Sequence, residues 1–234
     1  MDDKMRNVIK SAIREFERLS YISPEDIPDI PLYMDQITTF MDAKLAACKR
    51  HPEDKIFTKT MINNYTKNKL IPPPDKKKYS RDHLLSLIYV YYLKDFLQIS
   101  DIKTLLSALN ETPFAHREEE AMQSIYDAVF HLVKSQTGYM TKDLLKRWKM
   151  AREASFGTHA KEESGGTNDR DGADSRKGAD GRDGTARESC ADGDGYLNLF
   201  AFVCLLSFDV YVKKKLIETV VDELESSRES SRGE

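Results

Sequence analysis

The chain has 234 residues, 40% of them hydrophobic, which is enough for one or two domains with a sizeable core. Its formal net charge is −3, so any positively charged surface has to be local. The three cysteines are too few for a disulfide framework, which favours a reducing cytosol. The N-terminus has no apolar segment of the signal-peptide type, so we expect a cytoplasmic protein.

Residues 3–19 are predicted to form an amphipathic helix, and we assign 1–31 to this N-terminal helix and the turn after it. Acids and bases are mixed on its polar face, which favours packing against a protein core over lying on a membrane surface. The turn contains Ser23–Asp26, a capped start with proline at the first helical position. The apolar stripe of the helix consists of Met5, Val8, Ile9, Ala12, Ile13, Phe16 and Leu19.

A second main helix is expected from Leu32 to Cys48, followed by a polar connection. The next stretch, Thr58 to Tyr79, has three parts. A helix capped by Thr58 is predicted first, then Pro72-Pro73-Pro74 ends it, and three lysines and a tyrosine follow on an extended loop. We interpret this as a recognition helix with a short basic wing, in which the wing itself holds a minimal two-stranded ribbon.

The two faces of the predicted recognition helix differ in chemistry. Met61, Ile62 and Tyr65 form an apolar stripe. The opposite face carries lysine and asparagine but no acid; asparagine can pair bidentately with adenine, and lysine and threonine can contact phosphates. The residues predicted to bind double-stranded DNA are Thr58, Lys59, Thr60, Asn63, Asn64, Lys67, Lys76, Lys77, Lys78 and Arg81.

Positive charge is concentrated around this helix. From Lys44 to Arg81 there are 11 Lys or Arg and three acids, a net charge of +8 in a chain of −3. A local basic patch of this kind suits phosphate contact. An ordinary solvated basic face explains the charge count equally well.

The run Asn63 to Pro72 and the run Lys76 to Leu84 resemble the winged helix-turn-helix of the MerR regulators. More closely, Ile30 to Leu106 resembles a bacterial family of unknown function, domain-of-unknown-function family 1836, which carries this MerR-like region. The resemblance implies a DNA-binding transcriptional regulator with a winged-helix region over 32–110. Tyr65 matches the family's helix tyrosine, whereas Asn63 stands where MerR proteins usually have arginine and Lys69 where they usually have glycine.

Three further helices are predicted: Ser80 to Leu97, Ser100 to Leu109, and Arg117 to Ser135. The tyrosines of the first are expected in the core and not as a base-stacking platform. Gly138 is predicted to end the third, with a new helix from Thr141 to about Arg152, so that 111–156 forms a helical region.

Residues 157–195 consist mostly of Gly, Asp, Arg, Ser and Ala, and are predicted to be a disordered insertion, because they cannot bury enough apolar surface to offset their ordering entropy. The final region, 196–234, is expected to be a helix with a polar tail. Its apolar run 199–208 is too short for a membrane span by this reading. Its lower half offers a possible homodimer contact through Leu216, Val220 and Leu224.

No catalytic constellation is recognisable, so no enzyme, metal or cofactor is expected. The five histidines are scattered, and phosphate-loop and nucleophile-elbow motifs are missing. The helical patterns predict an all-α fold class with a C-terminal helical region, and the resemblance implies a MerR-like winged helix-turn-helix within it. The function expected is sequence-specific DNA binding. The alternative is a helical protein–protein adaptor that uses the winged fold without DNA.

Overall fold

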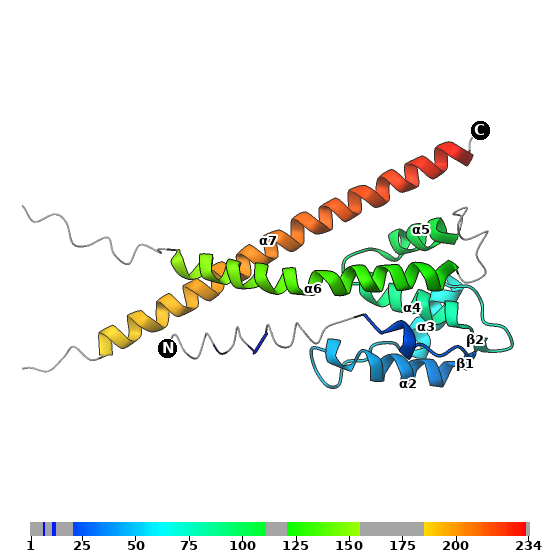
Figure 1. Cartoon of the computed structure of the whole chain (residues 1–234), viewed down its shortest axis with the longest axis horizontal. Coiled ribbons are helices and arrows are strands. Elements are labelled where there is room, and N and C mark those ends of the chain that lie inside the picture. Colours follow the sequence, from blue (N-terminus) through cyan, green and yellow to red (C-terminus); the bar gives the residue numbers. More distant parts are fainter. Residues whose placement is uncertain (1–6, 8–10, 13–20, 111–120, 155–184, 233–234) are drawn as a thin grey trace, which may run out of the picture. The chain divides into compact units, whose positions relative to one another are not determined.

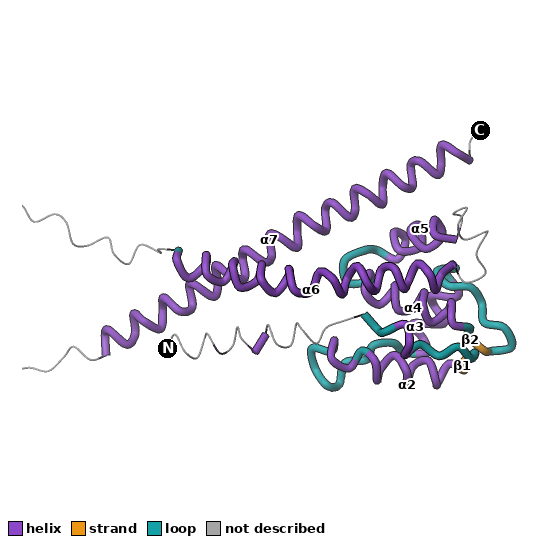
Figure 2. The backbone as a smooth tube through the Cα atoms, viewed as in Figure 1, coloured by secondary structure: helices purple, strands orange, loops and turns teal. Residues whose placement is uncertain are grey.

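The computed structural model describes residues 21–110, 121–154 and 185–232, together with Asn7, Ser11 and Ala12. Within these ranges the chain is mainly helical and contains one two-stranded sheet (Figure 2). The mainly helical fold class is thereby confirmed. Packing divides the chain into a main unit, Arg14–Met140 with Val210–Glu234, and a small unit, Met1–Ile13 with Thr141–Asp209.

The labelled elements follow one another along the chain with short connections in the first half (Figure 1). They are η1 (Pro24–Asp26), β1 (Leu32–Tyr33), α2 (Met34–Lys44), η2 (Ala46–Cys48), α3 (Lys59–Lys67), β2 (Lys78–Tyr79), α4 (Arg81–Leu93), α5 (Ile99–Asn110), α6 (Ala121–Glu153) and α7 (Thr185–Arg232).

The main unit is organised around α4, which is buried on almost every side from Leu84 to Val90. Each neighbouring helix adds its apolar stripe to the same core. The largest fully buried side chains of these helices include Ile37 and Met41 of α2, Ile62 of α3, Ile102 of α5 and Tyr126 of α6. Because α4 has no solvated face, it is the element that the others cover.

The tyrosines of α4 lie in or against this core, as the sequence predicts. Tyr92 stacks on Tyr21 with ring centroids 4.1 Å apart, and Tyr89 meets Tyr126 edge-on at 5.6 Å. The hydroxyl of Tyr126 donates to the Ile22 carbonyl at 2.7 Å. Burial raises the pKa of the Tyr91 hydroxyl to about 12, so this cluster is protonated and structural at neutral pH.

Helix α2 is shorter than the expected Leu32–Cys48 helix. Leu32 and Tyr33 form strand β1. The backbone N–H of Tyr33 donates to Gln36 Oε1 at 2.8 Å and caps the helix, which begins at Met34. Ala46–Cys48 forms a separate 3-10 turn. The predicted turn at Ser23 is present as η1, but the Ser23 side chain makes no cap hydrogen bond.

The sheet corrects the expectation of a ribbon within the wing. Strand β2 pairs antiparallel with β1, so that Lys78 lies opposite Tyr33 and Tyr79 opposite Leu32. The proline side of the wing cannot serve as the partner strand, because Pro72-Pro73-Pro74 has no N–H groups to donate. The wing is therefore attached to the segment that precedes α2.

Helix α6 corrects the expectation of a break at Gly138. A single helix runs from Ala121 to Glu153, and Gly138 lies within it with no heavy atom near its missing Cβ. A glycine costs about 1 kcal/mol in a helix interior, which a long helix without proline tolerates. Residues 117–120, the expected beginning of this helix, lie outside the described residues.

Helix α7 also differs from the sequence-based expectation. It begins at Thr185, so the last part of the predicted insertion, 185–195, is helical, whereas 155–184 lies outside the described residues. It continues to Arg232 through the expected polar tail. By length and composition alone, the helix Gly195–Ser230, which is longer than the run 199–208, contains a stretch apolar enough to cross a membrane.

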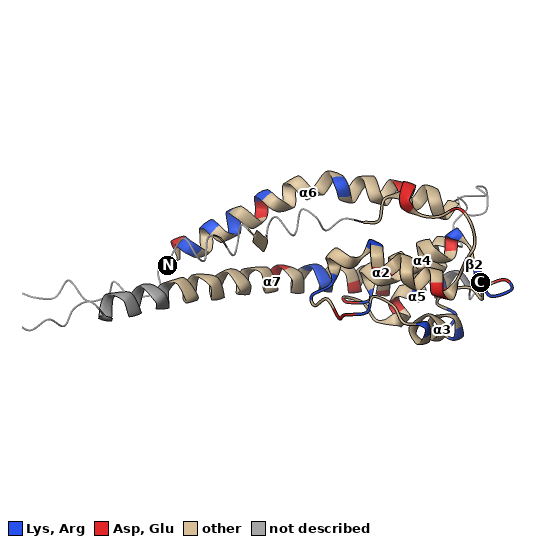
Figure 3. Ribbon diagram, turned by 90° about the horizontal axis from the view of Figure 1, so that it is seen from below, with Lys and Arg blue, Asp and Glu red and all other residues tan. Residues whose placement is uncertain are grey.

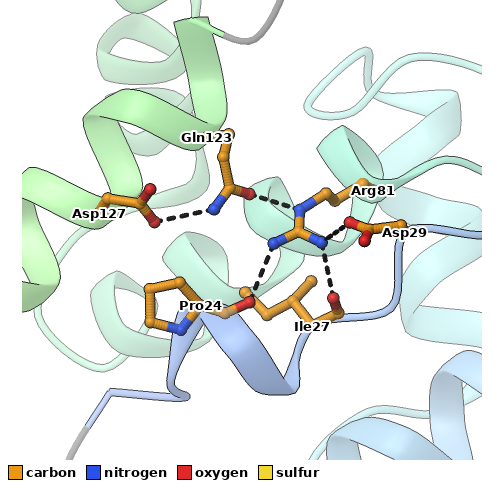
Figure 4. A network of polar contacts seen from close by, with 6 residues as sticks. All are labelled: Pro24, Ile27, Asp29, Arg81, Gln123 and Asp127. Carbon is orange, nitrogen blue, oxygen red and sulfur yellow. Dashed lines mark hydrogen bonds and ion pairs between the residues drawn. The ribbon is translucent and has the colours of Figure 1, made fainter.

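The Arg81 side chain connects three separate parts of the main unit (Figure 4). Its guanidinium donates to the carbonyl oxygens of Pro24 at 2.9 Å and Ile27 at 2.7 Å, and it pairs with Asp29. Its Nε donates to Gln123 Oε1 on α6. The segment before β1, the start of α4 and the start of α6 are thus joined by one cation.

We predict that Arg81→Ala lowers the stability of the main unit by more than about 3 kcal/mol, because hydrogen bonds to a charged group each contribute about 1.5–3 kcal/mol and several are lost together. Urea denaturation followed by circular dichroism measures the change. Lys103→Ala, an exposed position on α5, is the control. An unchanged urea midpoint in Arg81→Ala would contradict the structural role.

Candidate nucleic-acid interface

Helix α3 has a defined cap at each end. At its start, the Thr58 side chain accepts a hydrogen bond from the backbone N–H of Met61 at 3.2 Å, as the sequence predicts. At its end, the N–H of Leu70 donates to the Tyr65 carbonyl at 2.9 Å, and that of Lys69 to the Thr66 carbonyl at 3.1 Å. This is a Schellman motif, and Lys69 occupies its left-handed position with φ 57°.

The two faces of α3 are oriented as the sequence predicts. Ile62 and Tyr65 are buried, and the Tyr65 ring meets Phe57 edge-on at 6.1 Å. Thr58 is half-buried because it caps the helix. The predicted contact residues that are solvent-exposed on this helix are Lys59, Thr60, Asn63, Asn64 and Lys67.

The wing ends in a tight turn from Asp75 to Lys78. The N–H of Lys78 donates to the Asp75 carbonyl at 2.8 Å, and the central residues Lys76 and Lys77 have φ of 47° and 66°. Two consecutive positive φ angles match a type I′ turn, which asparagine and glycine normally occupy. All three lysines of the turn are exposed, and Figure 3 shows in blue the ribbon positions of the basic residues on α3 and on the loop leading to β2.

In the described part of the chain, the residues other than glycine that have positive φ are all lysines: Lys69, Lys76 and Lys77. A left-handed conformation costs an L-residue roughly 1–2 kcal/mol, which glycine avoids. Lys69 was not among the predicted contacts. The signal that could have revealed Lys69 is that MerR proteins usually have glycine at this position.

Three predicted contact residues have partners within the chain. Lys59 pairs with the exposed Asp35 of α2. The Lys78 Nζ lies 5.4 Å from the centroid of the Tyr33 ring, a cation–π contact at an exposed aromatic side chain. Arg81 differs from both, because its guanidinium is engaged inside the main unit as described above. The sequence could not distinguish Arg81 from a surface cation, since its acceptors, two backbone carbonyls and two side-chain oxygens, are all distant in the chain.

His83 fixes the junction between the wing and α4. Its Nδ1 accepts a hydrogen bond from the Ser80 N–H at 3.1 Å and lies 2.8 Å from Ser80 Oγ. Its ring meets Tyr79 edge-on at 5.4 Å. Burial lowers the pKa of His83, and the nearby carbonyl oxygens of Pro72 and Pro73 oppose this effect without cancelling it. The neutral ring therefore caps α4.

We predict that acid loosens this junction. The pKa of His83 is lower in the folded protein than in the unfolded chain, so its contribution to stability is complete above about pH 6.5 and is lost as the pH falls below that value. Melting temperatures between pH 7.5 and 5 measure the loss. His83→Gln keeps a side-chain acceptor at the same helix position and should show a weaker pH dependence. Parallel curves for the two proteins would contradict the assignment.

The described residues contain no group of three or more His, Cys, Asp or Glu side chains that could hold a metal ion. Two open depressions lie in the main unit. One, of about 550 Å³, lies between α2 and the 49–57 connection and includes the Lys49–Asp42 ion pair at 2.7 Å. The other, of about 420 Å³, lies between α5 and the end of α7. Neither adjoins the exposed face of α3.

Comparison with known families supports the part of the resemblance that concerns domain-of-unknown-function family 1836. Residues 22–129 match a family described as a domain of unknown function (DUF1836). The match begins at Ile22, before the expected Ile30, and ends at Val129 within α6. It therefore includes the acceptors of Arg81 before β1 and the first turns of α6, in agreement with their packing into one core.

No curated protein and no solved structure matches the chain. The description of the matched family names no function.

Proposed function

We propose that the DUF1836 domain of this chain is a MerR-like winged helix-turn-helix that binds double-stranded DNA and regulates transcription in the bacterial cytoplasm. In this proposal α3 enters the major groove and the wing lies along neighbouring phosphates. Base contacts from α3 provide specificity, and the lysines provide affinity.

The division of α3 into two faces supports this role. Its apolar side chains are used for the core, so the exposed side is available for a ligand. Asn63 and Asn64 present amides that suit bidentate contact with adenine, and Lys67 carries positive charge at the end of the same face. Two caps fix both ends of the helix, which reduces the ordering needed on binding.

The observation that carries the proposal is the lysine at each of the three left-handed positions. Stability alone favours glycine or asparagine there. Lysine contributes positive charge at a conformational cost, and such costs are concentrated at functional sites. Lys69 lies just after α3 and the other two form the wing tip, so the charge is arranged on both sides of the proline segment. A polyanion is the ligand that this arrangement fits.

Lys69 also supports the MerR-like reading of the fold. The resemblance places a glycine at this position, and the structure gives it the left-handed φ that glycine prefers. The departure from the pattern therefore preserves the backbone conformation and adds a charge.

A homodimer completes the proposal, because two recognition helices can read two half-sites. Leu216 and Val220 of α7 are 63% and 57% exposed, whereas Leu224 is half-buried and Val221 belongs to the core of the main unit. The exposed pair is thus available for a second copy on the side of α7 opposite Val221.

We predict that replacing the wing tip by Asp75-Asn-Gly-Lys78, the double change Lys76→Asn and Lys77→Gly, separates stability from binding. The turn becomes more stable by about 1–2 kcal/mol, because both residues then suit positive φ. Affinity for DNA falls, and the slope of log K against log salt decreases by about two units, because two phosphate contacts are lost. Thermal melting and fluorescence anisotropy at several salt concentrations measure the two effects.

Lys103→Gln is the matched control, since it removes one exposed charge from a helix away from the wing. It should change neither the melting temperature nor the salt slope appreciably. If the wing-tip variant is more stable and binds DNA as tightly as the parent, Lys76 and Lys77 do not contact phosphates.

We predict that Asn63→Ala or Asn64→Ala weakens binding to a preferred duplex by about 1–3 kcal/mol and leaves binding to random duplexes nearly unchanged. The preferred duplex is selected from a random library and compared with DNA upstream of the protein's own coding sequence. Light scattering of the complex gives its stoichiometry, which is two chains per duplex. Tyr65→Ala is the contrasting variant, because loss of its buried ring lowers stability first.

The Lys59–Asp35 ion pair favours a second candidate, a helical protein–protein adaptor, because an acid here reduces the positive charge at the start of α3. The same assay distinguishes the two. If the folded protein binds no duplex at low salt, the adaptor function replaces the DNA-binding function.

A further inference from the structure

The wing lysine Lys78 differs from the two lysines before it, because it belongs to a strand and has a partner on another strand. It lies opposite Tyr33 in the antiparallel pair of β2 with β1, and its Nζ is 5.4 Å from the centroid of the Tyr33 ring. Side chains that face each other across two strands are close enough for a cation–π contact of this kind. The register of the sheet therefore sets the position of the Lys78 side chain.

The same sheet turns the Tyr33 ring outward. Leu32 belongs to the core and is 7% exposed, so the alternation of a strand directs Tyr33 to the opposite side, where it is 51% exposed. The backbone N–H of Tyr33 is fixed by its hydrogen bond to Gln36 Oε1 at the start of α2. The ring is thus attached to a backbone that a strand and a helix start both hold in place.

The contact with Tyr33 leaves the charge of Lys78 available to a ligand. An aromatic ring attracts a cation through its quadrupole and has no net charge, so the ammonium is held without being neutralised. Lys59 shows the opposite case, because its ammonium is paired with the Asp35 carboxylate. In the part of the chain that the structure describes, no carboxylate forms an ion pair with Lys78.

The Tyr33–Lys78 pair lies between the wing and α3. Strand β1 runs directly into α2, and Asp35 in the first turn of α2 reaches Lys59, the first residue of α3. The sheet and the start of α2 therefore connect the wing to the start of α3 within a few residues (Figure 1). A DNA backbone that follows the wing toward α3 passes this pair.

We propose that Tyr33 is a positioning residue of the DNA interface, which holds the Lys78 ammonium so that it binds one phosphate of the duplex backbone. The inference rests on the proposed function and adds to it a residue outside α3 and the wing. A lysine side chain loses rotamer freedom when it binds a phosphate. The ring contact has removed part of that freedom beforehand, so the same charge gives a higher affinity.

The test is a double-mutant cycle of Tyr33→Leu and Lys78→Ala, with duplex affinity measured by fluorescence anisotropy at several salt concentrations. Lys78→Ala should reduce the slope of log K against log salt by about one unit, because one phosphate contact is lost. Tyr33→Leu should weaken binding about two- to fivefold with little change in slope, because the charge remains and only its positioning is lost. In the Lys78→Ala background, Tyr33→Leu should have almost no further effect.

Conservative variants and matched controls separate this role from a purely structural one. Tyr33→Phe and Tyr33→Trp keep an aromatic face and should restore the parent affinity. Lys134→Ala removes a lysine with a similar contact on α6, where its Nζ is 5.6 Å from the Phe130 centroid. Tyr139→Leu removes another exposed tyrosine of the same helix. Neither control should change the affinity or the salt slope.

NMR of the free protein measures the contact itself. The ring current of Tyr33 should shift the Hε protons of Lys78 upfield, and this shift should persist in Tyr33→Phe and disappear in Tyr33→Leu. Unshifted Lys78 protons in the parent overturn the proposal.

An equal effect of Tyr33→Leu with and without Lys78 also overturns the proposal, because the ring then contacts DNA directly or serves only the fold. In both cases the parent still binds DNA, and the proposed function stands. A folded parent that binds no duplex overturns the proposed function and this inference together.

Discussion

The guanidinium of Arg81 is the interaction on which the main unit depends. It stands two residues after β2 and holds the segment before β1 by two carbonyl oxygens and the Asp29 carboxylate. It reaches α6 through Gln123, whose amide in turn donates to Asp127 at 2.8 Å. Since the wing leads directly into Arg81, its base is fixed to both neighbours at once. A single cation with a planar, multiply donating head suits this role better than lysine.

This junction explains why the wing can be short. A long wing supports itself by pairing with its own return strand, but three prolines prevent that pairing here. Strand β1 provides the missing partner, and the neutral ring of His83 caps the helix that follows. The strained turn at Lys76 and Lys77 is thus followed by a strand and a helix start that are both held in place. Local strain persists where the surroundings hold it in place, and the stability of the core around α4 offsets its cost.

The long helices α6 and α7 contribute to both units. In the main unit, Tyr126 and Val221 belong to the core, and Arg228 donates to the Thr104 carbonyl at 3.0 Å. In the small unit the same two helices bury little, and α7 keeps aromatic side chains in solvent. In the small unit, α6 therefore covers only part of the apolar surface of α7.

Much of this protein was determined by local sequence. Periodicity gave the helical class and the inward side of α3, including Tyr65, and the Thr58 cap followed from a side chain that reaches its own helix. The runs around the prolines carried the resemblance to the family whose model matches residues 22–129. The tertiary structure decided what depends on distant partners. It paired β2 with β1 and placed Arg81 inside the main unit. The physical reason is that hydrogen bonds between distant segments, and conformations held by them, leave no periodic signal in the sequence that forms them.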